Sequence, residues 1–218
     1  MSKLDFYILD TETTGLKAGG YHEIHEISII RLKDKMQFSS DILCSYPKRA
    51  NFDALKLTSK SINDLSTVGK TRLHVVSTIN EMLETDGNIP NGRVIIAHNS
   101  AFDRRFVQSL WKQCNKNFPA HLWLDTLKMM RQYAKSQNWG KVSLGLENAC
   151  NILNIKTGNA HTAKHDTRMT YHLYNKLVNE FGVDYLPYIE NHPHNVVTEN
   201  TTIEYDDDDL SLLDDMDF

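Results

Sequence analysis

The first part of the chain has the hydrophobic pattern of β-strands. Apolar and β-branched residues are concentrated in short runs over residues 5–9, 24–32 and 37–45, with the length and bounding polar residues that are typical of strands. Residues 33–35, Lys-Asp-Lys, separate the second run from the third and predict the turn of a hairpin. The pattern therefore predicts three strands near the N-terminus.

Beyond residue 70 the pattern changes to that of helices alternating with strands. Apolar residues recur every three or four positions over residues 71–84, which predicts an amphipathic helix. A segment rich in Gly, Asn and Pro ends it, and a β-branched strand is expected over residues 93–97. Further helices are expected over residues 101–115, 126–137, 143–153 and 163–180, with a short strand before Asp125. Early strands followed by alternating strands and helices predict a mixed α/β sheet.

Composition narrows the class of protein. The 218 residues, of which 40% are hydrophobic, leave room for one domain of about 180 residues and a tail. No run reaches the roughly 20 apolar residues of a membrane helix, and no apolar signal core precedes the first strand. The three cysteines, Cys44, Cys114 and Cys150, form no zinc-binding pattern and are expected to be buried, reduced thiols. These features predict a cytoplasmic protein.

The net charge of −4 is distributed unevenly. Residues 204–218 contain eight acidic and no basic residues, so the rest of the chain has 24 basic against 20 acidic residues, a net charge of +4. A mildly basic body suits a polyanionic substrate. Because the periodic pattern fails from about Pro187, we expect a domain over residues 1–186 and a flexible acidic tail over residues 187–218.

Two acidic residues, Asp10 and Glu12, follow the first apolar run directly. Residues two apart on a strand project from the same face, so these carboxylates would repel each other. A fold keeps such a pair mainly when a cation lies between the two groups or when one of them is protonated. Hard divalent ions such as Mg²⁺ take oxygen ligands of this kind. The alternative is a strand that simply ends in an acidic turn.

Two later segments add groups of the same chemistry. Asp103 is expected in the first turn of the helix after the strand at 93–97, where a carboxylate either interacts with the helix dipole or helps to hold a metal. Further on, His161 precedes a helix that contains Asp166. A histidine on the loop and a carboxylate on the helix could meet at one site, although each alone could be a surface residue.

Taken in order, these segments closely resemble the DEDDh branch of the DnaQ-like 3′→5′ exonucleases, the family of the bacterial epsilon proofreading subunit and RNase T. The motifs are DTETTGL at residues 10–16, HNSAFD at residues 98–103 and HTAKHD at residues 161–166. The resemblance extends over roughly residues 4–182. Residues 57–62 depart from the family pattern, because the His-Gly pair that many members carry there is missing.

This resemblance implies a ribonuclease H-like fold, in which helices flank a mixed α/β sheet and the site lies at the carboxyl ends of central strands. Phosphodiester cleavage is well served by two divalent cations, here Mg²⁺ or Mn²⁺. We expect Asp10 to bridge both metals, Glu12 and Asp166 to complete the site that generates the nucleophile, and Asp103 to hold the second metal. His161 is the expected general base, since histidine titrates near neutral pH. His98 is expected to be structural.

The resemblance also implies contacts with the 3′-terminal nucleotide. The backbone of Thr13 and Thr14 would contact the terminal sugar, and Leu16 and Phe102 would pack on the terminal base. Stacking accepts every base, so little sequence preference is expected. For Leu16 and Phe102, packing in the core is the alternative.

The predicted function is that of an enzyme, a metal-dependent 3′→5′ exonuclease. It would release 5′-mononucleotides from single-stranded or mispaired DNA 3′ ends, in proofreading, repair or degradation. An exoribonuclease that trims RNA is the alternative, because RNase T and oligoribonuclease share the three motifs. A non-catalytic nucleic-acid-binding adaptor is an alternative of another class, which the intact carboxylates and His161 disfavour.

Residues 204–218 suggest a partner. Residues 209–213, Asp-Leu-Ser-Leu-Leu, loosely resemble the peptides that bind the bacterial sliding clamp, and residues 214–218 resemble the acidic, Phe-terminated tips of single-stranded-DNA-binding proteins. We therefore expect the tail to bind a replication partner: a clamp, a polymerase or a single-stranded-DNA-binding protein. A tail that competes with DNA for the basic body and a merely solubilising extension are the alternatives.

Overall fold

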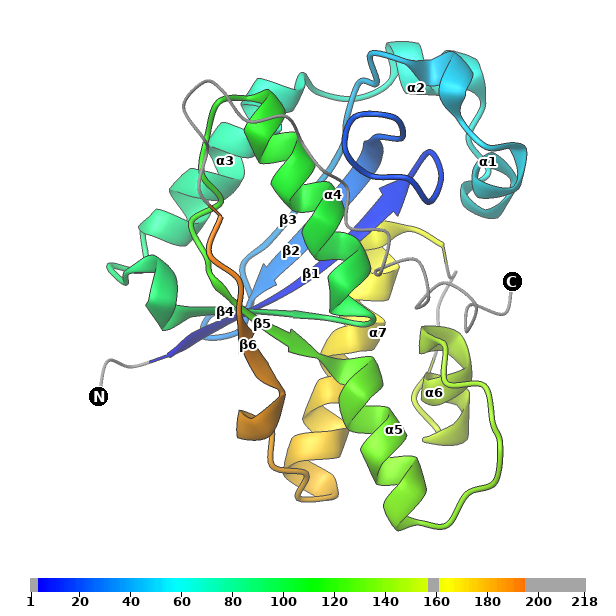
Figure 1. Cartoon of the computed structure of the whole chain (residues 1–218), viewed down its shortest axis with the longest axis vertical. Helices are drawn as coiled ribbons and strands as arrows, with labels where there is room; N and C mark the ends of the chain where they lie inside the picture. Colours follow the sequence, from blue (N-terminus) through cyan, green and yellow to red (C-terminus); the bar gives the residue numbers. More distant parts are fainter. Residues whose placement is uncertain (1–3, 157–160, 195–218) are drawn as a thin grey trace.

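The computed structural model describes residues 4–156 and 161–194. A six-stranded sheet runs through them in the order β3-β2-β1-β4-β5-β6 (Figure 1). The strands are β1 (Asp5–Thr13), β2 (Ile24–Arg31), β3 (Gln37–Asp41), β4 (Arg93–Ala97), β5 (Leu122–Asp125) and β6 (Ile189–Asn191). β1, β4 and β5 are parallel to one another, whereas β2, β3 and β6 are joined to their neighbours in antiparallel pairs. The predicted mixed α/β sheet is confirmed.

Helices cover both faces of the sheet (Figure 1). The core on one face contains side chains of α3 (Arg72–Glu84) and α4 (Ser100–Gln113). The core on the other face contains side chains of α5 (Thr126–Ser136), α6 (Leu146–Ile152) and α7 (Ala163–Asn175), and α7 continues into a π-helical turn over Lys176–Glu180. Two short helices, α1 (Phe52–Thr58) and α2 (Ile62–Thr67), lie beyond the carboxyl end of β1. Single 3-10 turns occupy Pro47–Arg49, Pro90–Gly92 and Leu186–Tyr188.

The alternation of side chains along β1 separates the two cores. Tyr7 and Leu9 are fully buried among residues of α3 and α4, whereas Ile8 is fully buried on the opposite face with residues of α7. Side chains alternate along a strand, so Asp10 and Glu12 continue the face of Ile8. The acidic pair therefore projects from the sheet toward α7.

The sequence predicted most of these elements and missed three. The hairpin turn at residues 33–35 and the strand before Asp125 are confirmed. α1, α2 and β6 were not expected. α1 and α2 each bury a single leucine, and β6 is a three-residue edge strand. These segments are too short to show a recurring hydrophobic pattern. Caps stabilise the helices instead: the Asn51 side chain accepts from the backbone of α1, and Ser61 with Asp64 forms a capping box on α2.

The sheet continues past the predicted domain limit at residue 186. β6 pairs with β5 through Asn191, and the buried His194 accepts a hydrogen bond from the backbone N–H of Phe118 at 3.0 Å. The domain therefore includes these residues. Residues 195–218 of the tail predicted for residues 187–218 lie outside the described residues, so the division into domain and tail stays a prediction.

Two expectations from composition can be compared with the described residues. No helix among them is long and apolar enough to cross a membrane. Cys44, Cys114 and Cys150 are free thiols, and only Cys150 is fully buried. Burial raises the pKa of Cys44 and of Cys150 to about 12, so both thiols stay protonated at neutral pH.

Candidate active site

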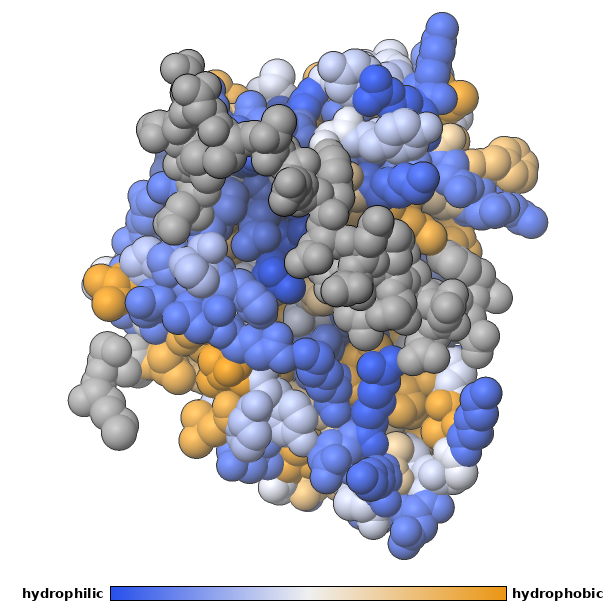
Figure 2. Space-filling view, viewed as in Figure 1, coloured by the Kyte–Doolittle hydropathy of each residue, from blue (hydrophilic) through white to orange (hydrophobic). Residues whose placement is uncertain are grey.

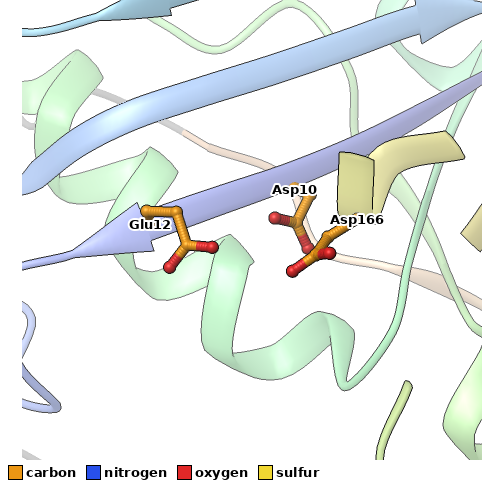
Figure 3. Close-up of side chains that lie close together, drawn as sticks. All are labelled: Asp10, Glu12 and Asp166. Carbon is orange, nitrogen blue, oxygen red and sulfur yellow. The ribbon is translucent and has the colours of Figure 1, made fainter. Parts of the chain in front are cut away.

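Three carboxylates meet where β1 passes α7. Asp10 and Glu12 project from β1, and Asp166 projects from the first turn of α7 toward them (Figure 3). One oxygen of each residue lies within 4.8 Å of an oxygen of each of the others. Asp10 and Asp166 are 156 positions apart in the chain. The structure therefore brings together residues from the first and the third sequence motif.

Asp103 reaches the same strand from the opposite face. Its Oδ1 atom accepts hydrogen bonds from the backbone N–H of Thr11 at 3.0 Å and from the Thr11 hydroxyl at 2.8 Å. Thr11 lies between Asp10 and Glu12 but points to the other side of the sheet. Asp103 is thus fixed next to the cluster, and its charge acts on Asp10, but it is not one of the three carboxylates that lie within 4.8 Å of one another.

Burial makes this site unfavourable for four negative charges. It is the main cause that raises the pKa of Glu12 to about 8, of Asp103 to about 7 and of Asp166 to about 6. The pKa of Asp10 is raised well above its usual range, first by burial and then by Asp103, Asp166 and Glu12. Such a group needs protons or a cation to be stable at neutral pH.

The donor set fits a hard divalent cation. The Oδ1 atom of Asp166 is buried and has no hydrogen-bond partner among the described residues. Unpartnered buried carboxylate oxygens are costly, and oxygen-only ligand sets suit Mg²⁺ and Mn²⁺. Asp10, Glu12 and Asp166 could hold such an ion directly, with Asp103 beside them.

The start of α7 positions His161 next to Asp166. The Thr162 hydroxyl caps the helix by accepting from the backbone N–H of His165 at 3.3 Å. The chain turns into this cap at His161, which has a left-handed backbone (φ 69°) and an exposed side chain. His161 lies close enough to Asp166 to lower the pKa of that carboxyl, which burial raises overall. His165 is half-buried and its Nδ1 lies 3.1 Å from the Thr162 hydroxyl, so it belongs to the cap.

A fifth carboxylate at the site, Glu26 on β2, was missed from the sequence. Glu26 lies directly opposite Glu12 in the antiparallel ladder, so both side chains share one face. Its carboxylate lies close to the backbone N–H groups of Ala163 and Lys164, the first two residues of α7, and these groups lower a pKa that burial raises overall. Glu26 therefore lies between the sheet and the start of the helix that carries Asp166. Glu26 is the one acidic residue of β2, and this was the available signal.

Asp125 at the end of β5 was also missed, and it positions the helix of Asp103. Its carboxylate accepts from the backbone N–H groups of Asn99 at 3.0 Å and Ser100 at 3.1 Å, where α4 begins, and from Leu127 at 2.8 Å in α5. His98 adds to this joint, with Nδ1 3.0 Å from the Thr126 hydroxyl and Nε2 2.9 Å from the Leu144 carbonyl. The expected structural role of His98 agrees with these bonds.

The residues expected to contact substrate lie around the carboxyl end of β1 and the start of α4. Leu16 is half-buried, and Phe102 is half-buried with its ring centre 4.9 Å from that of Phe106. The Thr14 backbone is already bonded on both sides, its N–H to Glu23 and its carbonyl to Asn51. Leu16 and Phe102 keep an accessible fraction, whereas Thr14 also acts as a structural junction.

Solved structures that superpose on this chain include nucleases. The zinc-bound complex of E. coli exonuclease I with single-stranded DNA superposes with a TM-score of 0.70 at 17% identity over 85% of this chain and 42% of that one. Cell-death related nuclease 4 gives 0.67 at 16% identity over 82% and 65%. Likeness at this identity defines the fold.

Sequence comparison defines the family. The family model described as "Exonuclease" matches residues 7–174, so the chain belongs to the exonuclease family. The DNA polymerase III subunit epsilon of Treponema pallidum is 29% identical over 79% of this chain and 76% of its own length. The 3′-5′ exonuclease DinG of Staphylococcus saprophyticus is 28% identical over 79% of this chain but only 18% of its own. The predicted DnaQ-like membership and the predicted class of enzyme are confirmed.

Most of the relatives are much longer than the segment they share with this chain. The chain spans about a fifth or less of the DinG and PolC-type relatives, so what those whole proteins do does not transfer to it directly.

Proposed function

We propose that this protein is a metal-dependent 3′→5′ exonuclease that releases 5′-mononucleotides from single-stranded or mispaired DNA ends. The observation that carries the proposal is the cluster of Asp10, Glu12 and Asp166, with Asp103 fixed beside it by Thr11. Membership of the exonuclease family supports hydrolysis of a nucleic acid from its end. Relatives named as a polymerase III epsilon subunit and a 3′-5′ exonuclease support the 3′→5′ direction.

The four carboxylates would hold two divalent cations, Mg²⁺ or Mn²⁺. When bound, the cations supply charge neutralisation and an activated water. Asp10 would be shared between both ions, Glu12 and Asp166 would complete one ion's ligands, and Asp103 would serve the other. Because Thr11 binds one oxygen of Asp103, this carboxylate keeps its orientation before substrate arrives.

His161 would act as the general base. Its side chain is exposed, and it lies close enough to Asp166 to lower the pKa of that carboxyl. It could thus accept a proton from the attacking water while α7 keeps it at a fixed place beside the cluster. The exposed ring can also pass this proton to solvent.

The substrate end would be bound at the carboxyl end of β1. Leu16 and Phe102 would pack on the terminal base, and the backbone of Thr13 and Thr14 would contact the sugar. Single-stranded DNA is the favoured substrate, because solved structures with this fold contain bound single-stranded oligonucleotides. RNA is the second candidate, and recognition of a 2′-hydroxyl would distinguish the two.

One digestion series tests this proposal. End-labelled single-stranded DNA, a mismatched primer-template and RNA of the same sequence are incubated with Mg²⁺, Mn²⁺ or a chelator. We expect stepwise loss of nucleotides from DNA with either ion and none with chelator. Faster loss from RNA would identify an exoribonuclease. Binding without loss of nucleotides under all conditions would identify the non-catalytic adaptor.

The acidic segment 204–218 is proposed to bind a replication partner, either a sliding clamp, a polymerase or a single-stranded-DNA-binding protein. Removing it should leave cleavage of free DNA unchanged and abolish binding to the partner in a pull-down with purified proteins. If the segment instead competes with DNA, the shortened chain binds DNA more tightly, most clearly at low salt. No change in either measurement would show a solubilising extension.

A further inference from the structure

Three side chains form an exposed stack beside the loop that follows β1. The guanidinium carbon of Arg49 lies 4.0 Å from the ring centre of Tyr46 and 5.5 Å from that of Tyr21. The ammonium group of Lys17 lies 5.9 Å from the Tyr21 ring. Both tyrosines are about half exposed, Tyr46 at 50% and Tyr21 at 52%. We call Tyr21, Tyr46 and Arg49 the aromatic platform.

Hydrogen bonds fix the platform to the chain segment that follows β1. The buried carboxylate of Glu23 accepts from the backbone N–H groups of Ser45 at 3.1 Å and Tyr46 at 2.8 Å. Arg49 donates to the Gly20 carbonyl at 3.3 Å. These bonds hold Tyr46 and Arg49 against the loop that carries Tyr21. The positions of the two rings are therefore fixed by backbone contacts as well as by their contacts with Arg49.

The platform lies close to the metal ligands. The backbone N–H of Asn51 donates to the Thr14 carbonyl at 2.7 Å. Thr14 is two residues beyond Glu12, and Arg49 is two residues before Asn51, so chain geometry limits the Cα atoms of Arg49 and Glu12 to about 20 Å apart. A strand whose 3′ end is in the site reaches this distance with a few nucleotides.

The surface next to the aromatic platform suits a ligand that has both negative charges and flat, apolar groups. Residues 46–60 contain four basic residues and one acidic residue, and Phe52 at the start of α1 is 76% exposed. Hydrophobic side chains stand among hydrophilic ones over α1 and α2 at the upper right of the space-filling view (Figure 2). Proteins that bind single-stranded nucleic acid without sequence preference combine cations with exposed rings on which bases stack.

We propose that the aromatic platform binds the bases of single-stranded DNA upstream of the 3′-terminal nucleotide. Bases would stack on Tyr21 and Tyr46, while Arg49 and Lys17 contact phosphates. This inference rests on the proposed function for the direction of the strand. The short helical segment after β3, which contains Arg49, would then hold the DNA between successive cleavage steps.

Binding of DNA without cleavage tests the platform. Fluorescence anisotropy measures the affinity of Asp10→Asn protein for labelled oligo-dT of 2 and 16 nucleotides. Adding Tyr21→Ala and Tyr46→Ala should weaken binding of the 16-mer by about 5- to 100-fold per ring, with little effect on the 2-mer, which is too short to reach the platform. Tyr21→Phe and Tyr46→Phe should restore binding, because the rings remain. Ile89→Ala, a 60% exposed residue before β4, is the control and should change nothing.

A second substrate separates the two proposals. The p-nitrophenyl ester of thymidine 5′-monophosphate occupies only the terminal subsite. Wild type and the double alanine variant, both with Asp10 intact, should hydrolyse it equally with Mg²⁺, while the KM for the 16-mer rises in the variant. Unchanged affinity for the 16-mer would overturn the platform. Failure of wild type to hydrolyse any of these substrates would overturn the proposed function and leave the binding result to decide on the platform.

Discussion

At the scale of single residues, neighbouring positions on β1 have different tasks. Asp10 and Glu12 face α7 and form the cluster with Asp166, whereas Thr11 between them faces the other side and binds Asp103. The alternation of a strand therefore gathers carboxylates that approach the sheet from both faces. A shift of one residue in register would remove all of these contacts at once.

Asp10 is the position at which a substitution should affect chemistry most and stability least. Asp10→Ala should lower cleavage by more than tenfold while the fold is kept, because the change removes a metal ligand and also relieves repulsion among buried acids. Rates on single-stranded DNA and thermal melting by circular dichroism measure both effects. More than a tenth of wild-type activity in a folded variant would contradict the assignment.

His161→Ala should lower the cleavage rate by about 10²–10⁴-fold and leave the affinity for Mn²⁺ nearly unchanged. The reason is that this substitution removes the base but keeps all four carboxylates. His165→Ala is the matched control, because His165 belongs to the helix cap; its loss should be much smaller. Equal rates for His161→Ala and wild type near neutral pH would show that another group accepts the proton.

At the scale of elements, the ends of helices carry the site and side-chain acceptors fix those ends. Asp125 joins the starts of α4 and α5, Thr162 caps α7, and Glu26 lies close to the first N–H groups of α7. Asp125 and Thr162 satisfy N–H groups that have no partner inside a helix. The site is therefore held by the junctions between helices and strands.

Asp125→Ala should destabilise the fold by about 2–4 kcal/mol, since three backbone donors lose a charged acceptor in a buried position. The free energy of unfolding from urea titration provides the measurement. Asp125→Asn, which keeps an acceptor oxygen, should lose less. A loss below 1 kcal/mol for the alanine variant would mean that water replaces the carboxylate easily.

The junctions also mark what the sequence could not predict. Long periodic segments such as α3 and α7 and the buried strands β1, β2 and β4 were expected near their observed positions. The motif residues Asp10, Glu12 and Asp166 were expected to meet, and they do. Glu26 and Asp125 were not foreseen, because their roles depend on which backbone N–H groups the fold brings opposite them. Local sequence gives no information on such long-range pairing.

At the scale of the whole molecule, the buried acids couple stability to pH and to metal. The pKa of Glu12 is raised from about 4.5 to about 8, so the folded state binds its proton more tightly than the unfolded state does. The stabilisation from this proton is present at low pH and is lost as pH rises through about 8. A divalent cation would replace the missing proton.

The melting temperature of the metal-free protein should therefore fall between pH 5 and pH 8 on this account. Mg²⁺ should raise it more at pH 8 than at pH 5, because binding competes with protons. Glu12→Gln, which cannot ionise, should show a smaller fall in the metal-free state. Differential scanning calorimetry with and without chelator measures both. A melting temperature of the metal-free protein that rises over this range would contradict the linkage.

The most direct measurement of the central claim uses one oligonucleotide with two kinds of 3′ end. Single-stranded DNA with a free 3′-hydroxyl and the same strand with a blocked 3′ end are incubated with the protein and Mg²⁺, and the products are identified by mass spectrometry. A metal-dependent 3′→5′ exonuclease releases 5′-mononucleotides from the free end only, and none in chelator. Internal fragments, release from the blocked strand or undiminished release in chelator would contradict the account.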